Sequence, residues 1–235
     1  MMQCGVHLEQ DLQGHWHLSQ EEFCQSISQV EESGATKDFN QHELHQCRAV
    51  LGAAQWRCDQ TGPQYSAKLN HLQSLLPRGD RQTLRDINMF VRELYHQKDE
   101  KITVYDFKAD SDEDIILVEW TGAALANRVD LTSTGGYVIG SVHRNMLERG
   151  VAGPVSLASW STHKLRQVCR SSLEAEGQAM SEGEAELFIN RILWQELFGK
   201  DVDLSHPSTT AALTTGALVT DAKALYDMLQ PKDIP

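Results

Sequence analysis

Apolar residues in the first hundred positions recur at helical spacings. The range 81–95 is the clearest case, because its apolar side chains lie three or four positions apart and therefore share one helix face. They are Leu84, Ile87, Phe90, Val91 and Leu94. Similar patterns predict helices over about 42–56 and around 69–76. We therefore expect a mostly helical region that ends near residue 97.

The start of the chain predicts a β-hairpin followed by a helix. A glycine-containing turn at 11–14 precedes the segment 15–18, which has the character of the second strand of a hairpin. Ser19 and Glu22 then have the spacing of a capping box, in which a serine and a glutamate three positions later satisfy the first N–H groups of a helix. This spacing predicts a helix that continues to about residue 30.

The pattern changes after residue 97. The stretch 97–114 is rich in charge and contains a candidate strand at 102–107, so it predicts a boundary between two domains, 1–97 and 98–235. The elements expected after it are three strands, a long helix, a fourth strand and a short helix. They cover 115–120, 136–142, 155–160, 171–198, 216–220 and 222–229.

This order of elements indicates an α+β protein. The long helix between the third and fourth strands forms a crossover, which places the fourth strand parallel to an earlier strand of the same sheet. The order matches the first half of a ribonuclease H-like fold. We therefore expect a helical and hairpin N-terminal segment, followed by a partial ribonuclease H-like mixed β-sheet with helices.

Composition is typical of a folded protein, with 235 residues, 40% hydrophobic and 23% charged. The longest apolar run, 187–194, is interrupted by Asn190 and Arg191 and falls well short of the roughly 18 residues of a membrane span. The N-terminus has neither a basic nor an apolar signal region. Five cysteines at irregular spacing favour reduced thiols. We expect an intracellular, cytoplasmic protein without a membrane partner.

The formal net charge of −12 opposes nucleic-acid binding through overall charge. A local basic tract is the alternative, and Lys164, Arg166 and Arg170 provide one just before the long helix. A solvated loop of mixed polarity explains the same residues about as well when charge alone is considered.

Several short segments in the second half resemble one family. The segments 120–128 (WTGAALANR) and 133–138 (STGGYV) resemble a block of copia-type retrotransposon polyproteins. The segments 159–161 (SWS) and 169–176 (CRSSLEAE) are similar to the next block of that family. The segment 218–224 (LVTDAKA) is similar to its third acidic block.

The resemblance extends upstream and keeps the family's order. The segments 17–20 (HLSQ), 48–56 (RAVLGAAQW) and 61–63 (TGP) resemble stretches late in the reverse transcriptase of the same polyproteins. The resemblance therefore implies the end of a reverse transcriptase at 1–97 and a truncated ribonuclease H-like domain at 98–235. It also implies that a later acidic ligand and the rest of the sheet would lie beyond Pro235.

The family activity is cleavage of the RNA strand of an RNA/DNA hybrid by two magnesium ions. Carried over by position, Glu176 is the second acidic ligand and Asp221 the third, whereas Gly122 stands at the first acidic position. Because glycine has no side-chain oxygen, the magnesium site is expected to be impaired and the chain weakly active or inactive. A non-catalytic nucleic-acid-binding remnant is the alternative.

Other roles are open to the acidic residues. Asp221 could cap the helix that follows it. Glu174 lies about 200° around the helix from Glu176, and its spacing from Ser171 is that of a capping box, which gives Glu174 a structural role. Glu119 precedes Gly122 by an odd number of positions, so the two should face opposite sides of the sheet.

Overall fold

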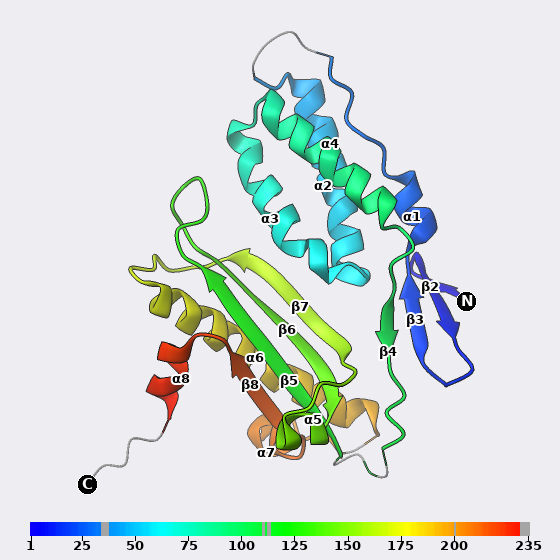
Figure 1. Cartoon of the computed structure of the whole chain (residues 1–235), viewed down its shortest axis with the longest axis vertical. Helices are drawn as coiled ribbons and strands as arrows, with labels where there is room; N and C mark the ends of the chain where they lie inside the picture. The colour runs from blue at the N-terminus through cyan, green and yellow to red at the C-terminus, as the bar shows by residue number, and fades with distance from the viewer. Residues whose placement is uncertain (34–37, 110, 112–113, 200, 231–235) are drawn as a thin grey trace. The chain divides into compact units, whose positions relative to one another are not determined.

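The computed structural model describes residues 1–235 except 34–37, 110, 112–113, 200 and 231–235. It divides the chain into two compact units, Met1–Val104 and Tyr105–Pro235. Each unit contains its own sheet and its own helices (Figure 1), so the α+β class is confirmed. The division lies later than the expected boundary at 97 because β4 (Ile102–Val104) pairs with β3 (Trp16–Ser19).

The first unit combines an antiparallel sheet with a helical core. Its strands, in sheet order, are β1 (Met2–Gln3), β2 (Val6–Gln10), β3 and β4. Its helices are α1 (Glu21–Ser26), α2 (Gln41–Gln60), α3 (Ser66–Leu75) and α4 (Arg81–His96), with 3-10 turns at Pro63–Tyr65 and Leu76–Arg78. The apolar faces of α2, α3 and α4 form the main core, as the helical spacing predicted.

The capping predicted at the start of α1 is wrong. The N-cap residue is Gln20, whose side chain makes no capping hydrogen bond, and the helix ends at Ser26 instead of continuing to residue 30. Ser19 is still part of β3, where it pairs with His7, so its backbone is engaged in the sheet. A capping box occurs instead at α2, between Asn40 and Glu43.

The second unit is a mixed sheet with helices. Its strands are β5 (Ile115–Ala124), β6 (Thr134–His143), β7 (Ser156–Lys164) and β8 (Gly216–Thr220), in the sheet order β7-β6-β5-β8. Its helices are α5 (Asn145–Arg149), α6 (Ser172–Leu197), α7 (Pro207–Ala212) and α8 (Lys223–Leu229). β8 pairs with β5 in parallel, which confirms the expected crossover.

The long helix α6 covers one face of this sheet (Figure 1). Leu187 from α6 packs on Leu117 and Ile139 from the sheet. Successive side chains of β5 alternate between the faces, and Ile116 and Val118 form a separate cluster on the opposite face. In the described part of the chain, no helix is long and apolar enough to cross a membrane.

Candidate functional site

The topology brings the predicted acidic positions to one edge of the second sheet. β5 and β8 are parallel, so their carboxyl ends meet at the same edge. Gly122 lies near the end of β5, and Asp221 follows β8 directly. Glu176 lies in the first turns of α6, the helix that packs on β5.

Glu176 is the most constrained residue at this edge. Its Oε2 atom is buried and has no hydrogen-bond partner among the described residues. Burial raises the pKa of Glu176, and the negative charge of Asp221 raises this pKa further. A hydrogen bond from the backbone N–H of Ala123 acts in the opposite direction. The charge of Asp221 therefore acts on Glu176, which lies next to the end of β5.

Asp221 does not cap the following helix. That helix, α8, has Ala222 at its N-cap position and no side-chain capping hydrogen bond. The Ala222 N–H donates instead to the hydroxyl of Thr220, at 3.1 Å. The alternative role as a helix cap is therefore wrong, and the exposed carboxylate of Asp221 is left beside Glu176.

Gly122 occupies an open position. It is exposed, and a Cβ atom built on it would meet no other atom within 4 Å. The last parallel pair of β5 and β8 is Thr121 with Thr220, so the next residues along the two strands are Gly122 and Asp221. Side chains at matched positions of neighbouring strands share a face. An aspartate at position 122 would therefore fit, on the sheet face opposite to α6.

The donor set at this edge is incomplete for a metal pair. Carboxylate oxygens suit magnesium, and this edge offers the unpartnered Oε2 of Glu176 and the exposed carboxylate of Asp221. Gly122 contributes no third carboxylate, and within the residues that the structure describes there is no group of three potential metal ligands. The residues present do not fit two metal ions, so no hydrolytic step follows from them.

Glu174 has the structural role that its spacing predicted. Its backbone N–H donates to the hydroxyl of the N-cap residue Ser171, at 3.2 Å. Its carboxylate accepts a hydrogen bond from the backbone N–H of Arg170, at 2.6 Å. Both interactions fix the entry into α6, which leaves Glu176 as the glutamate beside Asp221.

The basic tract differs along its length. Lys164, the last residue of β7, forms an ion pair with Asp130 at 2.6 Å. This ammonium group holds the pKa of Asp130 far below its usual range. Arg166 and Arg170 are exposed in the segment between β7 and α6. Two of the three predicted contact residues thus present their charge to solvent, whereas Lys164 is partly neutralised.

Glu119 is the acidic residue whose environment the sequence did not predict. Its side chain is fully buried under α6, and neither carboxylate oxygen has a hydrogen-bond partner within the described ranges. Burial, with a smaller contribution from Glu184, raises the pKa of Glu119 to about 7. A lone glutamate in the otherwise apolar run 115–120 was the available signal.

Glu119 and Gly122 face opposite sides of the sheet, as the strand period predicted. A Cβ atom at Gly183 of α6 would overlap the Glu119 carboxylate and lie 3.0 Å from the Thr121 side chain. Glu119 therefore does not substitute for the missing acid at position 122.

No protein-family model, curated protein or solved structure matches this chain.

Proposed function

We propose that the second unit is a degenerate ribonuclease H-like domain that binds RNA/DNA hybrids and cleaves them weakly or not at all. The observation that carries this proposal is the electrostatic interaction between Glu176 and Asp221 at the edge where the parallel strands β5 and β8 end. Asp221 makes no helix cap, so the site leaves an exposed carboxylate for a cation.

The sheet topology supports the same reading. Three antiparallel strands, a covering helix and a fourth strand parallel to the first follow one another along the chain. The copia-type segments 120–128, 169–176 and 218–224 fall at the end of β5, the start of α6 and the end of β8. These are the three places from which the acidic side chains of the family come.

The proposed weakness follows from the ligand set. Phosphodiester hydrolysis by two metals needs one ion for the attacking water and another for the leaving oxygen. Glu176 and Asp221 offer two carboxylates, and Gly122 offers none. Because the pKa of Glu176 is raised, a bound cation competes with a proton there, and magnesium affinity should increase as the pH rises.

Cleavage of a labelled RNA/DNA hybrid in magnesium tests the proposal. The original chain should cleave little, and Gly122→Asp should increase the rate at least about tenfold, since it restores a third carboxylate. Gly122→Asn is the matched control, because it adds a side chain of the same size without the charge. The double variant Gly122→Asp/Asp221→Ala should lose the gain. If Gly122→Asp changes neither cleavage nor magnesium affinity, the assignment of position 122 is wrong.

A non-catalytic nucleic-acid-binding remnant is the second candidate, and the exposure of Arg166 and Arg170 favours it. Hybrid affinity should fall with added salt, because phosphate contacts release counterions. The double variant Arg166→Ala/Arg170→Ala should weaken binding and reduce the salt dependence. Lys164→Ala should have a smaller effect because Asp130 already pairs with that lysine. Unchanged affinity in the double arginine variant would eliminate this candidate.

A further inference from the structure

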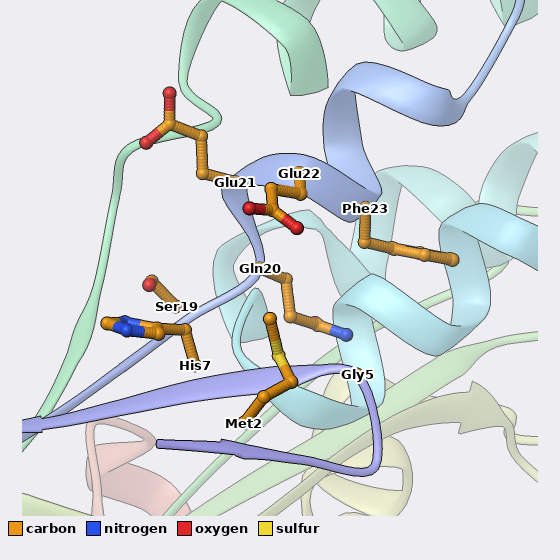
Figure 2. A pocket seen from close by; sticks show the side chains of 8 residues that line it. All are labelled: Met2, Gly5, His7, Ser19, Gln20, Glu21, Glu22 and Phe23. Atoms are coloured by element: carbon orange, nitrogen blue, oxygen red, sulfur yellow. The ribbon is translucent and has the colours of Figure 1, made fainter.

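The first unit contains a small cavity that is separate from the acidic edge. It measures about 210 Å³ and lies between the β1–β2 hairpin and the start of α1. Met2 and His7 line it from the strands, and Gln20 and Phe23 line it from the other side. Figure 2 shows the Met2 side chain projecting from the strand layer toward Gln20.

Gln20 is a buried polar group with an unused donor. Its side chain is only 2% exposed. The Oε1 atom accepts a hydrogen bond from the hydroxyl of Thr61, at 2.8 Å. The Nε2 atom is buried and has no partner among the described residues. A buried donor without an acceptor costs about 1–3 kcal/mol, so an acceptor oxygen in the cavity would recover that cost.

The orientation of this amide is fixed by its neighbours. A guanidinium N–H of Arg57 donates to the Thr61 hydroxyl oxygen. The single proton of that hydroxyl then has to point to an acceptor, which is Oε1 of Gln20. The amide nitrogen of Gln20 therefore faces away from Thr61. Arg57 is itself fully buried, and a chain of hydrogen bonds that starts at a cation strengthens the donor at its other end.

Two carboxylates determine which charge the cavity accepts. Glu21 and Glu22 both line it, and both are exposed. Glu21 forms an ion pair with Lys98 at 2.5 Å, which neutralises that carboxylate. Glu22 keeps its negative charge at the cavity wall, which disfavours an anion and favours a cation. The site therefore combines a strong neutral donor with one negative charge.

We propose that this cavity binds an α-amino amide, in which a protonated amine stands next to a carbonyl group. The carbonyl oxygen accepts from Nε2 of Gln20, and the ammonium group lies toward the Glu22 carboxylate. Two sources carry this chemistry, a free amino-acid amide and the amino terminus of a peptide. The apolar surfaces of Met2 and Phe23 provide contact for a small side chain.

Titration of the ¹⁵N-labelled full chain, followed by nuclear magnetic resonance, tests the proposal. The probe is glycinamide at about pH 6, where its amine is protonated. It should shift the Gln20 side-chain signals and bind several-fold more tightly than acetamide or ethylamine, which each lack one group. Acetate should not bind. Tight binding of triglycine amide but not of its N-acetylated form would identify a peptide terminus as the source, and preference for glycinamide over triglycine amide would identify the free molecule.

Three variants decide the role of the proposed contacts. Gln20→Met should weaken glycinamide binding about three- to tenfold, the value of one hydrogen bond. Gln29→Met is the matched control, because Gln29 is exposed and lies outside the cavity lining. Glu22→Gln should remove the preference for glycinamide over acetamide while leaving acetamide binding unchanged.

The proposal is overturned if Gln20→Met binds glycinamide as tightly as the Gln29→Met control, or if acetate binds as well as glycinamide. Circular dichroism checks that each variant is folded. Should Gln20→Met fail to fold, Glu22→Gln still decides the question, because Glu22 is exposed. A retained preference for glycinamide in that variant would then count as refutation.

Discussion

Among the described residues, each unit buries one glutamate completely, and the two environments are opposite. In the first unit, Glu43 accepts hydrogen bonds from the backbone N–H groups of Ser33, at 2.9 Å, and Asn40, at 3.0 Å. It also forms an ion pair with Arg81. In the second unit, Glu119 is equally buried, but neither of its oxygens has a hydrogen-bond partner within the described residues.

The difference shows that burial alone does not give an acid its role. Around Glu43, donors from three segments replace the water that a carboxylate loses, so the residue can be buried as an anion and can hold α2 in place. Around Glu119, the described residues supply no donor, so the neutral acid is the form that fits beneath α6. One glutamate is a structural anion, and the other is a proton-binding group in a core.

The largest expected effect is the loss of Glu43. Glu43→Ala removes the second half of the α2 capping box and leaves Arg81, whose side chain is 12% exposed, without this carboxylate. We expect the first unit to lose about 3 kcal/mol of unfolding free energy. Urea unfolding combined with hydrogen exchange of α2 measures it. Glu93→Ala is the control, since its ion pair with Lys68 is exposed and should contribute below about 1 kcal/mol.

Replacing Glu119 should change the pH dependence of the second unit. The pKa of Glu119 rises from an ordinary 4.5 to about 7 in the fold, so the folded state binds this proton more tightly. The contribution of this proton to the unfolding free energy is therefore fully present below pH 4.5. It is lost as the pH rises toward 7, which lowers the unfolding free energy by about 3 kcal/mol. Glu119→Gln cannot ionise and should remove this decline.

Unfolding in urea at a series of pH values measures the effect of Glu119→Gln. The exposed neighbour Glu184 provides the control, because Glu184→Gln should lower the pKa of Glu119 only slightly and keep most of the decline. If the stability of the Glu119→Gln variant falls with pH as steeply as that of the original chain, then Glu119 is ionised in the fold and the contrast with Glu43 disappears.

The two glutamates also show what the sequence can predict. Periodicity located α2 and β5 well, but hydrogen-bond partners depend on contacts that periodicity does not encode. Of the partners of Glu43, Ser33 lies outside any helix or strand, and Arg81 is distant in sequence. Glu119 is the single glutamate in the apolar run 115–120, but this pattern alone did not predict that its carboxylate is buried without partners.

The acidic edge was more accessible to sequence reasoning than the cavity. Glu176 and Asp221 were predicted by resemblance, and the parallel pairing of β8 with β5 places Asp221 at the end of β5. Strand alternation correctly separated Glu119 from Gly122. The role of Ser19 was wrong because a capping pattern cannot show that the residue is already paired in a sheet. The environment of Gln20 depends on Thr61, which no local pattern connects to it.

Gly183→Ala should lower the unfolding free energy of the second unit, by a smaller amount than the changes above. The new Cβ atom would overlap the Glu119 carboxylate under α6. We expect a loss of about 1–3 kcal/mol from overpacking, although alanine is intrinsically the better helix former. In a Glu119→Ala background the same substitution should cost much less, with only the 3.0 Å contact to the Thr121 side chain remaining. Urea unfolding of the double-mutant cycle measures this coupling, and strictly additive effects would show that the two residues do not touch.

The smallest expected effect is a gain in unfolding free energy, and it occurs in both units. Gly177 in α6 and Gly52 in α2 are helical glycines at which a Cβ atom would meet no other atom within 4 Å. Substitution by alanine should therefore stabilise each unit by about 0.5–1 kcal/mol, because the unfolded chain loses freedom and nothing is displaced. Thermal unfolding of Gly177→Ala, Gly52→Ala and Gly183→Ala measures all three in one series. A destabilised Gly177→Ala would mean that something covers the start of α6 in solution, and the site beside Glu176 would then be less open than its geometry indicates.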